Sequence, residues 1–256
     1  MMDRCRCCVL AGCAIIVLAV AAVEPVSFKD TFIKDCETKA KSTHCEEVWS
    51  AFEQAHVNQD HCQVPPEAYD HLLLSVAPPQ PNENRMLFWS EIKAVAHQVA
   101  KGCYQMLSDT LLGSVLDGKV WCGKKGSKET FTVGCPGWSF CVNNTVKSFW
   151  SRASAAFAAV AKGKVVVLLN GDSPTPFNPT SVFARIEVLG FKRDRVTSLT
   201  VVLVTKNEVG ANCTNASLDN LQDQLKTGIT YICKKMTESQ LIECTDANRK
   251  TCEACW

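Results

Sequence analysis

The fold class is decided by two apolar segments, Lys-Val-Val-Val-Leu-Leu-Asn at residues 164–170 and Thr-Ser-Leu-Thr-Val-Val-Leu-Val-Thr at residues 197–205. Both have the length of a strand, and both are rich in β-branched residues. Neither alternates strictly between apolar and polar positions. Such continuous runs are typical of strands that are covered on both faces, as in a parallel sheet. We therefore expect a parallel sheet in the C-terminal part of the chain.

Shorter segments complete this α/β part. Residues 183–189 and 228–233 are further strand candidates. Residues 217–227 lie between two predicted strands and indicate a crossover helix, with Ser217 as its N-cap.

The first half of the chain has a helical pattern instead. Apolar residues recur three or four positions apart in four segments, residues 28–41, 45–56, 67–76 and 88–101. A fifth helix is predicted at residues 145–162, a proline-rich loop at 77–82 and a glycine-bearing loop or hairpin at 123–137. We predict a mainly helical domain at residues 23–162, an α/β domain at residues 163–256 and a cleft between them, and the chain is free to cross between the two.

Composition excludes two classes of protein. The 256 residues include 27 Lys and Arg against 26 Asp and Glu, a net charge of +1, so the chain lacks the basic excess of a nucleic-acid-binding protein. Apolar residues make up 46% of the chain, which argues against extensive disorder.

Residues 1–22 have the pattern of a secretory signal peptide. Arg4 and Arg6 precede an apolar run of about 15 residues, which is shorter than the ~20 residues of a membrane-spanning helix. Small residues follow, so cleavage is expected after Ala21 or Ala22 and the protein is expected to be secreted. The alternative is an uncleaved anchor at the cell surface, palmitoylated at a cysteine among residues 5–8.

Twelve of the sixteen cysteines follow residue 22, and an even number in an exported chain predicts six disulfides. These cysteines are Cys36, Cys45, Cys62, Cys103, Cys122, Cys135, Cys141, Cys213, Cys233, Cys244, Cys252 and Cys255. Glycosylation sequons at Asn143, Asn212 and Asn215 fit an exported surface. The histidines lack metal-ligand spacing, so we expect no metal site.

A few residues stand out as candidates for chemistry. Trp89 and Trp150 fall in helix-like segments, Glu187 falls in an apolar strand candidate, and Asp109 and Asp117 flank a short apolar segment. Each also has a structural interpretation: the tryptophans as core residues, Glu187 as a solvent-facing strand residue and Asp109 as a helix N-cap. These residues alone predict only an exported α/β protein with six disulfides.

Six short blocks, in this order along the chain, resemble the ADP-ribosyl cyclase family of NAD glycohydrolases. They are Leu-Phe-Trp-Ser at 87–90, Ser-Asp-Thr-Leu-Leu-Gly at 108–113, Val-Trp-Cys-Gly at 120–123, Ser-Phe-Trp at 148–150, Leu-Asn-Gly at 169–171, and the pair Phe183 and Glu187. The resemblance covers about residues 28–252. It implies a helical domain beside a four-stranded parallel sheet, with the active site in the cleft between them.

The resemblance also implies roles for single residues. Glu187, Trp150 and Trp89 match catalytic positions. Further positions match substrate-binding residues, namely Ser90, Ser108, Asp109, Asp117, Ser154 and Phe183. NAD or NADP would be the substrate, with no cofactor required, and the products would be nicotinamide, ADP-ribose and cyclic ADP-ribose.

Three positions depart from the family pattern. Ser108 stands where the family usually has Glu, Glu91 where some members have Arg, and Val182 where a phosphate-contacting Thr is common. Glu91 cannot clamp a pyrophosphate as Arg does. The competing hypothesis is therefore a weakly active or inactive receptor or adhesion protein on the same fold. A homodimer is a further open expectation.

The resemblance implies five disulfides, Cys36–Cys45, Cys62–Cys141, Cys122–Cys135, Cys213–Cys233 and Cys244–Cys252. Cys103 and Cys255 are then left, and we predict that they form the sixth. Some relatives have another bridge at the positions of Glu83 and Lys162.

Overall fold

The computed structural model describes residues 27–40, 44–76, 80–252 and 254–256. The predicted leader at residues 1–22, with its alternative as an anchor, lies outside these residues, as does part of the proline-rich loop. None of the helices in the described ranges combines the length and the apolar composition that a transmembrane span requires.

Four parallel strands form one sheet in the order β1-β2-β3-β4. The strands are β1 (Met86–Ser90), β2 (Gly163–Asn170), β3 (Val196–Thr205) and β4 (Thr230–Thr237). Phe88 of β1 pairs with Val167 of β2, which pairs with Val201 of β3, and Val201 pairs with Cys233 of β4. The parallel sheet predicted from the apolar segments is confirmed.

Both faces of the sheet are covered, which explains why β2 and β3 are apolar along their whole length. On one face, Leu87, Val166 and Val202 pack with residues of α4 (Lys93–Ala100) and α9 (Glu238–Ala247). On the other face, Val165, Val167 and further strand residues pack with four helical segments. These are α6 (Thr145–Ala159), the π-helix η3 (Phe183–Glu187), α7 (Val188–Gly190) and α8 (Ala216–Gln224).

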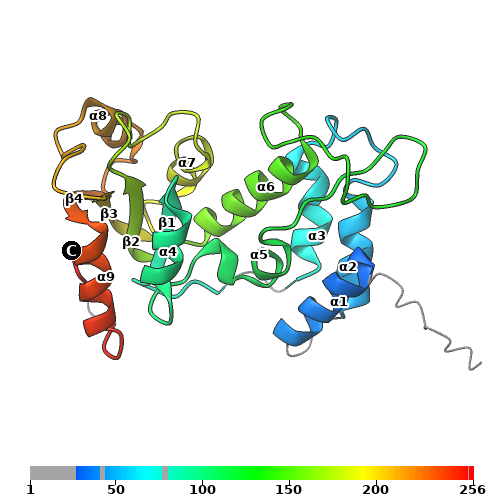
Figure 1. The fold of residues 1–256 in the computed structure, drawn as a ribbon, viewed down its shortest axis with the longest axis horizontal. Helices are drawn as coiled ribbons and strands as arrows, with labels where there is room; N and C mark the ends of the chain where they lie inside the picture. Colours follow the sequence, from blue (N-terminus) through cyan, green and yellow to red (C-terminus); the bar gives the residue numbers. More distant parts are fainter. Residues whose placement is uncertain (1–26, 41–43, 77–79, 253) are drawn as a thin grey trace, which may run out of the picture.

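The other helices of the described chain lie outside the sheet layers. They are α1 (Phe28–Lys39), α2 (Cys45–Gln54), the 3₁₀ turn η1 (Pro66–Tyr69), α3 (Asp70–Leu74), the 3₁₀ turn η2 (Leu107–Asp109) and α5 (Leu111–Leu116). Their core is aromatic, and Phe52 packs with Phe32, Trp49 and Trp121. Figure 1 shows the sheet and α9 at one end of the long axis, α1 and α2 at the other, and α6 running between them. β1 and α4 precede residue 163 in the sequence but belong to the sheet layers. The chain therefore crosses between the helical part and the α/β part.

The sequence prediction was wrong for two segments. Residues 88–101 were expected to form one helix, but residues 86–90 form the edge strand β1 and the helix begins only at Lys93. A run of four apolar residues, as at 86–89, fits either structure, and here pairing with β2 decides it. Residues 183–189, expected to be a strand, form η3 and α7, because this apolar segment packs on the face of the sheet instead of adding to its edge.

Two predicted N-caps were also wrong. The crossover helix α8 is capped by the Asn215 side chain, which accepts a hydrogen bond from the amide of Ser217. Helix α5 is capped by Thr110, whose hydroxyl accepts from the amide of Gly113. Asp109 instead accepts a hydrogen bond from the amide of Met106 at 2.7 Å.

Six disulfides are present among the described residues, and four of the predicted pairings are confirmed: Cys36–Cys45, Cys62–Cys141, Cys122–Cys135 and Cys213–Cys233. The remaining four cysteines pair differently. Cys103 bonds to Cys252 and Cys244 bonds to Cys255, so the predicted pairs Cys103–Cys255 and Cys244–Cys252 were wrong.

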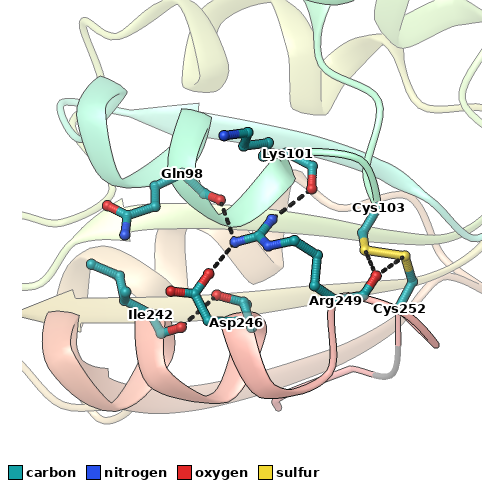
Figure 2. Close-up of polar contacts among 8 residues, drawn as sticks. Gln98, Lys101, Cys103, Ile242, Asp246, Arg249 and Cys252 are labelled. Carbon is teal, nitrogen blue, oxygen red and sulfur yellow. Dashed lines mark hydrogen bonds and ion pairs between the residues drawn. A yellow bond between two sulfur atoms is a disulfide. The ribbon is translucent and has the colours of Figure 1, made fainter.

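Arg249 explains this exchange of partners. Its guanidinium group donates to the carbonyl oxygens of Lys101, at 2.6 Å, and Gln98, at 3.5 Å, at the end of α4 (Figure 2). The segment after α9 is therefore held against α4, which places Cys252 beside Cys103. Cys255 bonds to Cys244 on α9.

Glu83 and Lys162, at the positions of the additional bridge in some relatives, form an ion pair of 2.8 Å. The ion pair therefore joins the same two positions that the additional disulfide joins in those relatives. Both side chains are about half exposed, so the ion pair itself contributes little to stability.

His56 makes the stability of the fold depend on pH. The side chain is fully buried in the helical part, and its Nε2 lies 2.9 Å from the Thr130 hydroxyl. Burial lowers the pKa of His56 to about 4, and a backbone hydrogen bond with Phe52 partly opposes this effect. Because the unfolded chain takes up the proton near pH 6.5, stability present above that pH is lost as the pH falls toward 4.

We expect the free energy of unfolding to fall by about 1–3 kcal/mol between about pH 7 and about pH 5 through His56 alone. Urea unfolding of wild type and His56→Gln at the two pH values measures this contribution. The variant keeps a polar group near Thr130 but cannot titrate, so it should lose less stability on acidification. Equal losses in the two proteins would contradict the assignment.

Candidate active site

A cavity of about 660 Å³ opens at the carboxyl end of β1. Its walls come from β1 and the start of α4, from η2 and the residues that follow α5, from α6, and from the segment that leads into η3. The ends of parallel strands are the usual place for binding sites in α/β proteins. The cavity therefore lies where the sheet meets the helical part.

Trp89 and Ser90 are the last two residues of β1, and both line the cavity. Trp89 is half-buried, while Ser90 is buried. The strand places them at the rim of the sheet, although the sequence had suggested a helix here.

Trp150 and Ser154 reach the cavity from α6. They are four residues apart, so they lie on one side of the helix. Asn144 caps this helix by accepting a hydrogen bond from the amide of Lys147. The alanine-rich remainder of α6 packs against η3 and α7, which fixes the helix beside the segment that carries Glu187.

Glu187 is the last residue of the π-helix η3, and its side chain lines the cavity with only 7% of the residue exposed. The amide of Val188 donates to the carbonyl of Phe183, five residues earlier. Such a widened turn inserts a residue into the helical path, and π-helices are frequent at functional sites. Phe183 also borders the cavity, and its ring packs with Phe88 and Phe177.

Burial changes the ionisation of Glu187. Its pKa is raised from 4.5 to about 7 because the carboxylate is removed from water, and the nearby Ser154 hydroxyl opposes the shift by hydrogen bonding to the charged form. The carboxyl group is therefore poised to change its charge near neutral pH. A carboxyl group with such a displaced pKa in a cavity is a candidate functional group.

Ser108 and Asp117 complete the predicted residues that line the cavity. The Ser108 hydroxyl oxygen is buried and has no hydrogen-bond partner among the described residues. Asp117 is the C-cap residue that follows α5, and it forms an ion pair of 2.6 Å with Lys93. Asp109 does not line this cavity, because its carboxylate turns to the backbone of Met106 and borders a neighbouring surface hollow.

Several lining residues were missed in the sequence. Lys93 begins α4, Trp138 lies in the loop between two disulfide cysteines, and Asn178 and Thr180 precede η3. The only signal for the last two was a segment rich in Ser, Pro and Asn, which indicates a loop and no particular site. Glu91 and Val182, singled out as departures from the family pattern, both line the cavity.

The arrangement suits the binding of a flat cationic ring beside a sugar. Aromatic faces such as those of Trp89 and Trp150 attract a cationic ring by about 0.5–2 kcal/mol each, and a buried carboxylate stabilises positive charge that develops next to it. Ser90, Ser108 and Ser154 are further polar residues of the wall. Among the described residues, Asp60, His61 and Cys62 are grouped closely enough for a metal ion, but Cys62 is in a disulfide and the group lies outside the cavity.

Comparison with known sequences gives a consistent result. The sequence model of the ADP-ribosyl cyclase family matches residues 26–253. The mouse ADP-ribosyl cyclase/cyclic ADP-ribose hydrolase 1 is 33% identical over 207 residues, which cover 76% of this chain and 68% of the relative. The human ADP-ribosyl cyclase/cyclic ADP-ribose hydrolase 2 is 28% identical over 234 residues, which cover 85% of this chain and 72% of the relative.

Solved structures agree with the sequence comparison. A structure of CD38 described with a covalent enzyme–substrate complex superimposes with a TM-score of 0.77 at 29% identity, covering 84% of this chain and 93% of CD38. Porcine CD38 with a covalent intermediate, ribo-F-ribose-5'-phosphate, gives 0.76 at 29% identity, with coverage of 83% and 97%. The Aplysia cyclase bound to NGD and cGDPR shares the fold, with a TM-score of 0.75 at 23% identity over 89% of this chain and 96% of that one. With the family sequence pattern matched over nearly all described residues and the same fold in its solved members, this chain belongs to the ADP-ribosyl cyclase family.

Proposed function

We propose that this protein cleaves the bond between nicotinamide and ribose in NAD or NADP, and that it forms ADP-ribose and cyclic ADP-ribose from NAD. The observation that carries the proposal is the buried Glu187 carboxyl group in a cavity with Trp89 and Trp150, in a chain of this family. The relatives named as cyclases and cyclic ADP-ribose hydrolases support the same reaction class.

The chemistry needs few groups from the protein. Nicotinamide in NAD is a pyridinium ring, so it leaves with the electron pair of the broken bond and becomes neutral without a general acid. The ribose carbon is left with positive charge that the Glu187 carboxylate stabilises. Water at this carbon gives ADP-ribose and a proton, whereas attack by the adenine ring of the same molecule gives cyclic ADP-ribose. One carboxylate replaces the two that ordinary glycosidases use.

The test is the release of nicotinamide from NAD by the purified protein, with both nucleotide products separated and quantified. We expect stoichiometric nicotinamide and a mixture of linear and cyclic product. Release no faster than in buffer would contradict the proposal and favour the receptor or adhesion hypothesis.

We also propose that the reaction takes place outside the cell. The leader-like pattern at residues 1–22, the sequons and the six disulfides support export, since disulfides persist in oxidising compartments. Expression in cultured cells with a C-terminal tag tests this. Tagged protein in the medium beginning near residue 22 is expected, whereas full-length protein retained on the cell surface would support the anchor instead.

Ser108 is expected to influence the ratio of the two products. Ser108 lines the cavity and its buried hydroxyl oxygen has no hydrogen-bond partner among the described residues, so we expect a longer acidic side chain at this position to enter the cavity. A carboxylate there would orient water at the ribose carbon. We expect Ser108→Glu to shift the products toward ADP-ribose by about tenfold, which needs only about 1.4 kcal/mol of difference between the two transition states.

The ratio of cyclic to linear product from NAD measures this effect. Ser108→Gln is the matched control, because it has the same size without the charge. An unchanged ratio in Ser108→Glu, or a shift toward the cyclic product, would contradict the prediction.

A further inference from the structure

The charges in the cavity wall do not balance. Besides Glu187, the wall contains the acidic residues Glu91 and Asp117 and the cations Lys93 and Lys119. Lys93 is paired with Asp117 at 2.6 Å, and Lys119 is paired at 2.5 Å with Asp35, which is not part of the wall. Both lysines are therefore neutralised. Glu91 has no cationic partner among the described residues.

Glu91 is held in place by its backbone and its neighbours. Its φ of 59° lies in the left-handed region, which is uncommon for a residue of this kind. The Asn178 amide nitrogen donates a hydrogen bond of 2.7 Å to the Glu91 carboxylate. The Asn178 amide oxygen accepts from the amide and the hydroxyl of Thr180, at 2.9 and 2.8 Å, so the amide group is fixed with its NH₂ toward Glu91.

This network joins the end of β1 to the segment that leads into η3, and all three of its residues line the cavity. Glu91 itself is exposed, so its carboxylate is a negative charge at the solvent-facing part of the wall, held there by the hydrogen bond from Asn178. A substrate that carries phosphate groups brings further negative charge into the same cavity.

We propose that Glu91 is a specificity-determining residue that selects against phosphate charge on the substrate. Repulsion between its carboxylate and the phosphate groups weakens binding in proportion to their number, so NADP is penalised more than NAD, and nicotinamide riboside, which has no phosphate, is not penalised. The site would thus favour nicotinamide nucleosides with few phosphates. This inference rests on the proposed function, since it concerns the substrate of the same cavity.

The variant Glu91→Gln tests the proposal, because it keeps a hydrogen-bond acceptor for Asn178 and removes only the charge. kcat and KM are measured for nicotinamide riboside, NAD and NADP, which contain none, two and three phosphate groups and release the same nicotinamide. We expect KM to fall roughly threefold for NAD and roughly tenfold for NADP, with little change for the riboside. Glu37→Gln is the matched control, because Glu37 is exposed on α1 outside the cavity and its loss changes the net charge equally.

Salt gives a second, independent measurement. Added salt screens repulsion, so KM of the wild type for NADP should fall as ionic strength rises, and this dependence should weaken in Glu91→Gln. A rise of KM with salt in the wild type would overturn the proposal, because it would mean that the phosphates meet a net attraction, as when Lys93 leaves Asp117 to bind them. Equal effects of Glu91→Gln on all three substrates would overturn it too. Absence of nicotinamide release from every substrate is a different result, and it would contradict the proposed function itself.

Discussion

Glu187→Gln is expected to lower nicotinamide release from NAD by about 10²- to 10³-fold, the usual cost of removing a group that stabilises charge in a transition state. Glutamine has nearly the same size and fits the same place at the end of η3. It cannot supply the negative charge that the ribose carbon requires when nicotinamide leaves. Steady-state assays of both proteins measure the effect. Activity of the variant within about tenfold of wild type would show that the decisive charge comes from another residue.

The same substitution is expected to stabilise the fold at alkaline pH. Folding raises the pKa of Glu187 from 4.5 to about 7, so the folded state holds the proton more tightly than the unfolded state. The stability that comes from the protonated carboxyl group is present below pH 4.5 and is lost as the pH rises through about 7. Above pH 7 the ionised Glu187 therefore costs about 3 kcal/mol, which glutamine avoids in part.

Urea unfolding of both proteins at pH 8 and near pH 5 measures this difference. The variant should have the larger free energy of unfolding at pH 8, and the difference between the two proteins should become smaller toward pH 5. Lower activity together with higher stability separates a catalytic role from damage to the fold, because a damaged fold would lose both. For the wild type, nicotinamide release should also decline as the pH falls below about 7, where Glu187 takes up its proton.

The sequence predicted those parts of the fold in which one physical signal dominates. β2 and β3 are continuous apolar runs because they are covered on both faces. β1 was missed because its five residues continue into a true helix with a similar apolar spacing. The π-helix η3 was missed because its apolar residues pack on the face of the sheet, and an apolar run of that length also fits a strand.

The residues of the candidate site were also predicted only in part. The family resemblance pointed to Trp89, Trp150, Ser154 and Glu187. All four line the cavity, although Trp89 and Glu187 were assigned to the wrong element. Asn178 and Thr180 lie on a loop, where side-chain positions depend on tertiary contacts such as the hydrogen bond to Glu91. Asp109 shows the converse: its block matches the family, but its carboxylate bonds to the backbone of Met106 instead of entering the cavity.

The disulfide between Cys103 and Cys252 is expected to make the largest contribution of any single link to stability. It joins residues 149 positions apart, the widest separation among the disulfides of the described chain. In the chain-entropy model, closing a loop of that length stabilises the folded state by about 5 kcal/mol. The double variant Cys103→Ala with Cys252→Ala should lose up to this amount in denaturant unfolding.

The neighbouring pair Cys244–Cys255 is the matched control, because it lies in the same region but spans only 11 positions. Its removal should cost about 3 kcal/mol in the same model, so the two double variants should differ by about 2 kcal/mol. Equal losses would mean that native-state strain or residual unfolded-state structure, and not loop length, sets the contribution of these links.

The single variant Cys103→Ala tests the pairing itself. Among the cysteines of the described residues it leaves one free thiol, which alkylation followed by peptide mass analysis identifies. The contacts of Arg249 with the end of α4 hold Cys252 beside Cys103, so the alkylated residue should be Cys252. Alkylation at Cys255 would instead support the pairing that the sequence had suggested. In a separate variant, Arg249→Ala with all cysteines retained, we expect Cys103 to bond to Cys255 in a fraction of the molecules. The reason is that the contact that holds Cys252 beside Cys103 is lost.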